Sequence, residues 1–405
     1  MKMTDSLFKT STILTMFALF SFVGCSELAE SNMEENSEEG APVTFILESP
    51  SKNNTRGNKF NVFSVSSFTV YGFYGATQRW KGVNMVKDAD GSWNSTSGAL
   101  SWPSGNMNVF ATIPAATTMG VKNVVMKRMA KEDDKTYFPK YFEYELPDSN
   151  KYQTDMAFSS AIDINQYTAD GNVKFAPRTY LSYIQFNIRL MIQDIGVIVR
   201  SATIHQVRTT ARIEFNQYYK EQATITVNDN EWGKITQVFG NDEPVDLEYN
   251  VTTKCSGDSV LMIQPQSTVA TVSTGTVMYQ GKSTKVYQPM ADADAAHNSY
   301  IELDCQIKKD NGSGGFVYLT EDYSTWDSNP HWVKCYFPFS KKTWKSNTTN
   351  NVTIKFDIPY DVNGQPIELP EYTPTTNMEY SVTIEEWEDD TDEDNSLYIK
   401  FVDKN

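Results

Sequence analysis

The segment Gly91–Pro114, "GSWNSTSGALSWPSGNMNVFATIP", places Trp93 and Trp102 nine residues apart among small polar residues. Each indole ring buries on the order of 200 Å² when it enters a core. Two interpretations of the segment follow. Either it contains two strand ends whose Trp93, Trp102 and Phe110 side chains are buried in one core, or it is an exposed platform on which sugars stack. A platform requires exposed, coplanar rings, and nothing in the spacing demands that. We favour the core.

Runs of alternating apolar and polar residues recur on both sides of this segment, with turn residues between them. They span residues 43–48, 67–75, 107–114, 181–190, 223–229, 259–266, 351–358 and 396–402. No stretch longer than about ten residues keeps a helical period. Aromatic residues make up 13% of the chain. The pattern predicts an all-β protein built from sandwiches.

The first 24 residues have the features of a secretory signal peptide. Lys2 and Lys9 precede an apolar run, Ile13–Val23, that is too short to span a bilayer. The run ends in "FVGC", which resembles the lipobox of bacterial lipoproteins and predicts lipidation of Cys25. The alternative is an ordinary secretory signal with an incidental cysteine. Lipidation implies a lipid-anchored precursor at the outer membrane and cell surface.

Residues 25–41 form an acidic stretch after this cysteine. Between Ser26 and Gly40 the chain holds six glutamates and no basic residue, so it predicts a solvated tether. The stretch also resembles the acidic signal of surface-displayed lipoproteins of the Bacteroidetes. The alternative is a tether whose charge only keeps it extended.

The length and net charge of the chain limit the number of domains and the kinds of partner that we expect. About 380 residues follow the signal peptide, which favours two domains. We expect an N-terminal β-sandwich over 42–172 and a C-terminal one over 173–405, the latter with an acidic stretch and a terminal strand. The net charge of −16 argues against nucleic acid or an anionic membrane surface as a partner.

Catalytic and metal-binding motifs are not found in the sequence. The histidines are His205, His297 and His331, and they lie in no recognised catalytic or metal-binding pattern. The acidic runs 88–91 and 291–294 read as turns, since neither continues to the distal glutamate of a calcium loop. Residues 385–394 have eight carboxylates in ten positions, which predicts a solvated connector. We predict no enzyme, cofactor or metal site.

Three cysteines follow Cys25, so at most one intramolecular disulfide forms among them. Cys305 and Cys335 sit in strand-like runs, where each is equally well a buried small hydrophobe. Whether any disulfide joins Cys255, Cys305 and Cys335 stays open.

Five segments in a fixed order resemble the fimbrillins, pilin-like lipoproteins of the Bacteroidetes that build type V pili. They are "FTVYGFYG" (68–75), the opening segment (91–114), "YQTDMAFSSA" (152–161), "VKFAPRTYLSYIQFNI" (173–188) and "VLMIQPQS" (260–267). The resemblance implies two tandem transthyretin-like, Greek-key β-sandwiches. It also implies that Trp93 ends one strand and that Trp102 starts the next. The implied function is that of a structural or tip subunit of a cell-surface fimbria, serving adhesion.

The resemblance further implies how subunits assemble. In fimbrillins an arginine-specific protease is thought to cut a loop and release the first strand, and Arg56 matches that role here. Val43, Phe45 and Leu47 should point into the first domain's core, so their loss would open a groove for a strand from another subunit. The alternative is that Arg56 is an ordinary exposed loop residue.

The C-terminal run suggests the incoming strand. Leu397, Ile399 and Phe401 alternate on one face, and the acidic stretch before them would let the strand reach a neighbouring subunit. The alternative is an ordinary final strand paired within its own domain.

Two other functions remain open at this level. One is a monomeric, surface-exposed lipoprotein that binds a glycan through exposed tryptophans such as Trp80, Trp326 or Trp332. The other is an unrecognised surface hydrolase. The partners expected are thus other fimbrial subunits, membrane lipid, an arginine-specific protease, and a glycan or protein on a host or bacterial surface.

Overall fold

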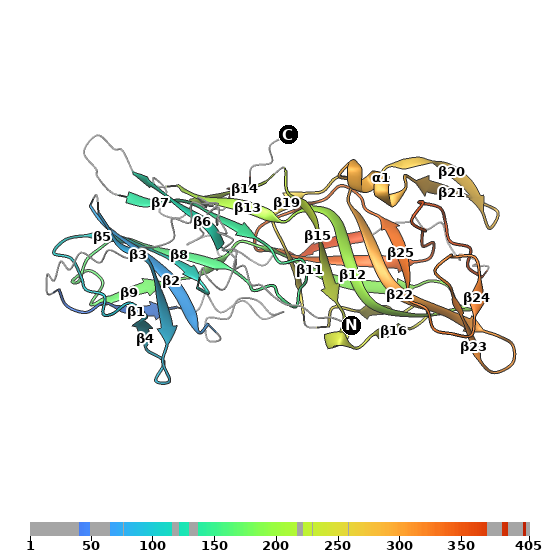
Figure 1. Ribbon diagram of the computed structural model, residues 1–405, viewed down its shortest axis with the longest axis horizontal. Coiled ribbons are helices and arrows are strands. Elements are labelled where there is room, and N and C mark those ends of the chain that lie inside the picture. The colour runs from blue at the N-terminus through green and yellow to red at the C-terminus, as the bar shows by residue number, and fades with distance from the viewer. Residues whose placement is uncertain are drawn as a thin grey trace, which may run out of the picture. The chain divides into compact units, whose positions relative to one another are not determined.

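The all-β prediction is confirmed by the computed structural model (Figure 1). The structure describes residues 40–48, 65–75, 77–115, 121–128, 137–216, 222–228, 230–257, 259–370, 383–387 and 400–401. Among these residues the only α-helix is the short α1 (Met290–Ala295), and a 3₁₀ turn covers Gly240–Asp242. No helix in this part of the chain has the length and apolar character needed to cross a membrane.

A six-stranded antiparallel sheet forms the first part of the molecule, in the order β10-β8-β5-β2-β3-β4. Its strands are β2 (Ser67–Tyr74), β3 (Thr77–Lys87), β4 (Trp93–Ser95), β5 (Met107–Ile113), β8 (Ala157–Ile164) and β10 (Arg178–Thr179). All seven residues of β5 are buried, which means that both faces of the sheet are covered. A strand alternates its side chains between faces, so β2 sends Phe68 to one core and Phe73 to the other.

A two-stranded parallel sheet packs against one face of this sheet. It consists of β1 (Thr44–Leu47) and β9 (Asn172–Phe175), whose pairing runs from Thr44 opposite Asn172 to Leu47 opposite Phe175. The apolar residues of the two strands join those of β2, β3 and β5 in one hydrophobic cluster.

A five-stranded sheet combines strands from distant parts of the sequence, in the order β29-β14-β13-β7-β6. The strands are β6 (Val121–Arg128), β7 (Tyr137–Glu145), β13 (Thr210–Asn216), β14 (Gln222–Val227) and β29 (Lys400–Phe401). Phe142 of β7 contacts Tyr71 and Phe158, with ring centroids 5.6 and 5.3 Å apart. This sheet therefore packs toward the second face of the six-stranded sheet.

A seven-stranded sheet and a second five-stranded sheet build most of the rest. A seven-stranded sheet contains β12 (Gly196–Arg208), β15 (Trp232–Val238), β16 (Val245–Leu247), β22 (Tyr300–Asp310), β23 (Phe316–Leu319), β24 (Trp326–Asp327) and β25 (Val333–Pro338). A five-stranded sheet contains β11 (Ser182–Leu190), β17 (Thr252–Lys254), β18 (Leu261–Ile263), β27 (Thr349–Phe356) and β28 (Thr383–Trp387). Every second residue of β27 is buried, as expected where one face of a strand meets a core.

Two small ribbons complete the described strands. They are β19 (Gln266–Ser267) with β26 (Thr343–Trp344), and the hairpin β20 (Ser273–Tyr279) with β21 (Lys282–Tyr287). A small tyrosine-rich cluster packs α1 and the β20–β21 hairpin against Tyr300 and Tyr336 of the large sheet.

Three expectations about local structure were wrong. Trp93 begins the short strand β4 and does not end a strand, and Trp102 lies outside the strands, five residues before β5. Residues 291–294, expected as a turn, form most of α1. The run 259–266 contains only the three-residue strand β18 before β19 begins at Gln266.

The division at residues 172 and 173 stays a prediction. Gly40–Asn405 forms one compact unit, and Val173 shares a hydrophobic cluster with Val43 and Phe45. Strands β6 and β7, from before this boundary, share a sheet with β13 and β14, from after it. A division based on packing would place β9 with the first sandwich.

Candidate functional site

The first strand is held by backbone bonds on both sides. On one side lies the parallel ladder to β9, extended by a bond from Glu48 N to Phe175 O (2.8 Å). On the other side, Val43 N donates to Leu100 O (2.8 Å) and Trp102 N donates to Ala41 O (3.0 Å). Among the described strands, β9 is the only one that pairs with β1.

The apolar face of β1 enters an aromatic core. Val43 and Phe45 are buried, and Leu47 is half-buried against the same cluster. The Phe45 ring lies 5.8 Å from Phe68, 6.0 Å from Trp80 and 6.0 Å from Phe175, measured between ring centroids. Thr44 and Ile46, on the opposite face, are exposed. The alternation along β1 therefore separates a core face from a solvent face.

The three aromatic residues of the opening segment occupy different parts of this region. Trp102 is 2% exposed, and its Nε1 donates to Gly171 O at 3.4 Å. Trp93 is half-buried, with its ring centroid 4.7 Å from that of Phe68. Phe110 is buried on the other face of the sheet, 5.9 Å from Phe73. Each ring packs in a core, and none forms part of a flat exposed platform.

The backbone before β1 passes very close to Trp102. A Cβ atom added at Gly40 would lie 2.0 Å from the carbonyl oxygen of Trp102. This is far inside van der Waals contact, so a glycine is required at this crossing. The segment leading into β1 thus lies directly against the tryptophan.

Several residues singled out in the sequence lie outside the described residues: Cys25, Arg56, Leu397 and Ile399. At the C-terminus, Lys400 and Phe401 form β29, which pairs in parallel with Thr224 and Ile225 of β14.

Three glutamines form a joint that the sequence did not predict. Gln153 exchanges two bonds with the backbone of Met262, at 2.8 and 3.1 Å. Gln264 is fully buried, and its Nε2 donates to Tyr144 O and Thr209 O, both at 3.2 Å. Gln266 exchanges two bonds with the backbone of Arg208, at 2.8 and 2.9 Å. This glutamine joint ties β7 and the segment before β8 to the region of β12, β18 and β19.

The glutamine joint uses segments already noted in the sequence. Gln153 lies in "YQTDMAFSSA", and the other two lie in "VLMIQPQS". The sequence signal for this joint was the presence of glutamines inside largely apolar segments. A buried amide must find hydrogen-bond partners, so such a glutamine indicates a long-range polar contact. The sequence could not show that two segments about a hundred residues apart meet here.

The tryptophans considered for glycan binding are poorly placed for it. Trp80 is 3% exposed, so the expectation that it lies on the surface was wrong. Trp326 and Trp332 are half-buried, and a cation covers each ring. Lys309 Nζ lies 4.1 Å from the Trp326 centroid, and the Arg200 guanidinium carbon lies 4.3 Å from that of Trp332. A ring face that binds a cation is not open to a sugar.

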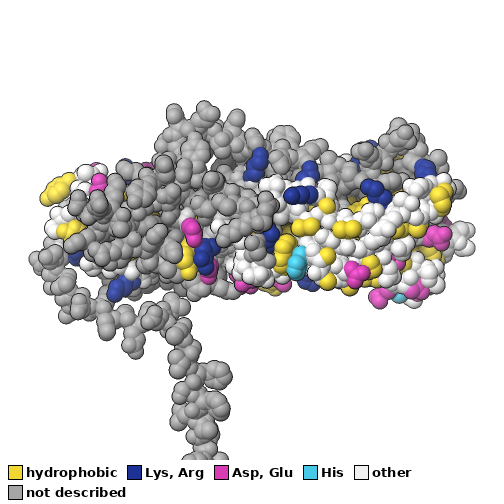
Figure 2. All heavy atoms as spheres, turned by 90° about the horizontal axis from the view of Figure 1, so that it is seen from above, with side chains coloured by type: hydrophobic (Ala, Val, Ile, Leu, Met, Phe, Trp, Pro, Cys, Tyr) yellow, Lys and Arg dark blue, Asp and Glu magenta, His cyan; other side chains and the backbone are white. Residues whose placement is uncertain are grey.

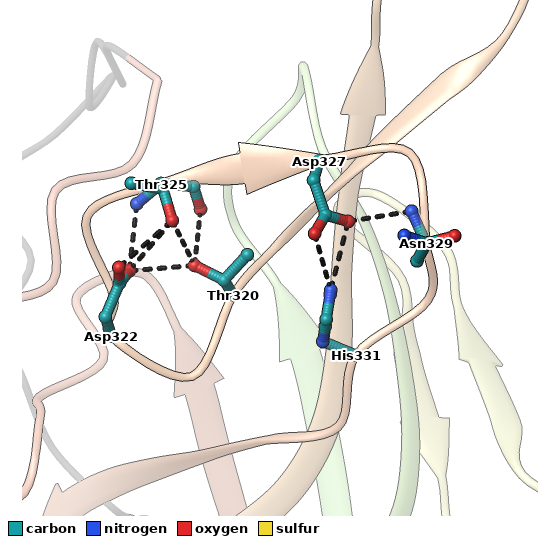
Figure 3. Close-up of polar contacts among 6 residues, drawn as sticks. All are labelled: Thr320, Asp322, Thr325, Asp327, Asn329 and His331. Carbon is teal, nitrogen blue, oxygen red and sulfur yellow. Dashed lines mark hydrogen bonds and ion pairs between the residues drawn. The ribbon is translucent and has the colours of Figure 1, made fainter.

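The polar loop beside Trp326 satisfies its own groups (Figure 3). Asp322 accepts bonds from Thr320 Oγ1 at 2.8 Å and from Thr325 N at 3.0 Å. His331 Nε2 lies 3.0 and 2.9 Å from the two carboxylate oxygens of Asp327. The backbone bond from Asn329 and the bond to His331 lower the pKa of Asp327. In the part of the chain that the structure describes, no group of three or more acidic, histidine or cysteine residues could hold a metal.

Comparison with known proteins gives structural neighbours and no sequence relatives. No protein-family model and no curated protein matches the chain. Solved fimbrial and cell-adhesion proteins are similar to it in structure. One is a fimbrial protein from Bacteroides vulgatus, 12% identical, with a TM-score of 0.45 over 78% of this chain and 95% of that one.

Two further neighbours are described as putative cell adhesion proteins. One, from Bacteroides ovatus, covers 86% of this chain and 96% of its own, with 10% identity and a TM-score of 0.38. The other, from Parabacteroides distasonis, has the same identity and TM-score and covers 86% and 97%.

Proposed function

We propose that this chain is a structural or tip subunit of a cell-surface fimbria of the type V kind. It would be exported as a lipoprotein through Cys25, reach the outer membrane and cell surface, and serve adhesion to a host or bacterial surface. It would assemble by strand exchange with other subunits after cleavage by an arginine-specific protease.

The observation that carries this proposal is the way β1 is built into the core. The strand is short, it comes first in the described chain, and it pairs with a single other strand, β9. Its buried side chains contribute about 1.5–3 kcal/mol each, so a body that loses them exposes apolar surface and an unpaired edge. An extended segment with the same alternation regains both the ladder and the pockets.

The position of Arg56 suits a cut that frees this strand. The connection that contains it runs from the end of β1 at Leu47 to the start of β2 at Ser67. Cleavage there leaves β1 covalently joined only to the residues before it, including the proposed lipid anchor at Cys25. The strand is then held in the core by non-covalent contacts alone and is free to exchange.

The replacement strand we propose is the C-terminal one. Leu397, Ile399 and Phe401 repeat the spacing of Val43, Phe45 and Leu47, with one apolar side chain at every second position. An extended segment with this period presents one apolar face to a groove. The remaining alternative is that it stays an ordinary final strand of its own subunit.

The proposal is tested at Arg56. We expect limited treatment with an arginine-specific protease to cut the folded chain near this residue and the cut protein to form fibres, seen by electron microscopy. Arg56→Ala should be cut more slowly and assemble poorly, whereas Lys59→Ala, the matched control in the same connection, should behave as the parent. An Arg56→Ala chain that assembles as well as the parent refutes the gating role.

A further inference from the structure

The hairpin β20–β21 has an open edge. Among the described strands, β20 pairs only with β21, and six of its seven residues are exposed. In Figure 1 the hairpin lies beside α1 at the outer side of the large sheet. Figure 2 looks onto this side and shows hydrophobic side chains on the described surface.

The turn determines which backbone groups point outward. Gln280 and Gly281 form a two-residue turn with φ of 47° and 73°, so Tyr279 and Lys282 are the closing hydrogen-bonded pair. Hydrogen-bonded and non-hydrogen-bonded pairs then alternate along an antiparallel ribbon. Thr276 and Met278 therefore direct their N–H and C=O groups away from β21, toward a side on which no described strand lies.

The composition of this edge is unusual for an exposed strand. From Thr268 to Gly281 the chain has no charged residue and no proline, whereas β21 carries Lys282 and Lys285. Val277 and Met278 are 36% and 71% exposed, and Val269 and Val272, just before β20, are 40% and 47% exposed. Natural edge strands are usually protected by lysine or proline, which prevent pairing with another chain.

The net charge of the whole chain indicates which partner strand would pair with this edge. Two copies of a chain with net charge −16 repel each other over most of their surfaces. An uncharged edge is a place where they can meet without opposing like charges. A two-fold axis also makes two identical strands run antiparallel, which is the pairing that such an edge accepts.

We propose that β20 is a homotypic contact, in which two copies of this chain pair their β20 strands about a two-fold axis centred on Val277. Thr276 of one copy then lies opposite Met278 of the other, and the two exchange backbone hydrogen bonds. The contact is far smaller than a stable dimer interface, so it is weak by itself and gains strength where many copies are held close together. It does not depend on the proposed fimbrial function.

Cysteine cross-linking of the full-length chain tests this contact. With the axis at Val277, the two copies of this residue face each other as a non-hydrogen-bonded pair, with Cβ atoms about 4.5–5.5 Å apart. Under mild oxidation we expect Val277→Cys to give a covalent species of twice the monomer mass. Ser283→Cys, at another exposed position on β21, is the matched control and should stay monomeric.

A second change shows whether the edge itself makes the contact. The N–H of Thr276 points away from β21, so Thr276→Pro leaves the hairpin intact and removes one backbone bond per copy, which is two in the symmetric contact. Added to Val277→Cys, it should lower the cross-linking yield at least several-fold without changing the melting temperature. The proposal is overturned if Val277→Cys cross-links no faster than Ser283→Cys, or if Thr276→Pro leaves the yield unchanged.

Discussion

Individual residues on β1 have very different roles although they alternate along one short strand. Phe45 contacts three aromatic rings in the core, while its neighbour Ile46 is 39% exposed. Burial, and not hydrophobicity alone, determines how much each side chain stabilises the protein. Substitutions at Phe45 and Ile46 therefore measure how much the packing of β1 contributes to the free energy of unfolding.

We expect Phe45→Ala to lower the free energy of unfolding by about 3–5 kcal/mol, because it removes a buried ring and leaves a cavity. Ile46→Ala, on the exposed face of the same strand, should change it by less than about 1 kcal/mol. Urea unfolding followed by tryptophan fluorescence measures both. Equal losses in the two variants would contradict the burial seen for β1.

Glu302 on β22 is a half-buried carboxylate whose charge depends on its neighbours. Its Oε2 lies 3.2 Å from His205 Nε2, and its Oε1 lies 3.0 Å from Lys334 Nζ. Burial alone would raise the pKa of Glu302, but the bonds from His205 and Lys334 outweigh it and hold the pKa at about 2. The unfolded chain, with the ordinary pKa near 4.5, binds a proton more readily.

Glu302 therefore stabilises the folded protein fully above about pH 4.5, and this contribution is lost as the pH falls toward 2. We expect Glu302→Gln to lower the free energy of unfolding at pH 6 by on the order of 1–2 kcal/mol, with allowance for solvent screening. The difference between the two proteins should shrink steadily on acidification. A difference that stays constant from pH 6 to pH 3 would show that the carboxylate charge has no such role.

At the scale of elements, long-range polar contacts connect parts of the chain that the strand pattern leaves separate. The glutamine joint is the clearest example, because Gln264 donates to carbonyls on either side of the expected domain boundary. Gln264 is fully buried and Tyr144 is 1% exposed, so water has little access to the bond between them. Loss of the amide would remove the bonds that Gln264 Nε2 donates to Tyr144 O and Thr209 O, although Thr209 O would keep its bond from Leu146 N (2.9 Å). A buried polar group that loses its partner costs about 1–3 kcal/mol.

We expect Gln264→Ala to destabilise the protein by about 2–5 kcal/mol, from the lost bonds and the cavity together. Gln365 is exposed, and Gln365→Ala serves as the control with no measurable effect. Differential scanning calorimetry of the two variants reports the change. If Gln264→Ala melts with the parent, the joint is not a stabilising contact.

At the scale of the whole molecule, we propose that the N-terminal segment determines where the protein resides. The "FVGC" sequence places Cys25 after an apolar run of signal-peptide size. We expect Cys25→Ser to remove the protein from the membrane fraction or to block its maturation, and to abolish labelling by a palmitate analogue. Unchanged membrane association together with unchanged labelling would exclude lipid anchoring at this residue.

The sequence alone determined the fold class and the alternation of the first strand. Both follow from the two-residue period of a β-strand, which is a local property and is visible in a single chain. The same period predicted that Val43 and Phe45 face inward, and the net charge of −16 argued against a nucleic-acid partner.

Only the tertiary structure decided which strands are neighbours. The period of two says that a side chain alternates between faces, but it does not say what covers each face. Trp80 looked like a surface residue in the sequence and is buried because β1 packs over its sheet. Gln264 lies in the alternating run 259–266 and is buried because β7 and Thr209, which directly follows β12, meet around it. Contacts between residues far apart in the chain depend on the packing of whole sheets, and no local pattern contains that information.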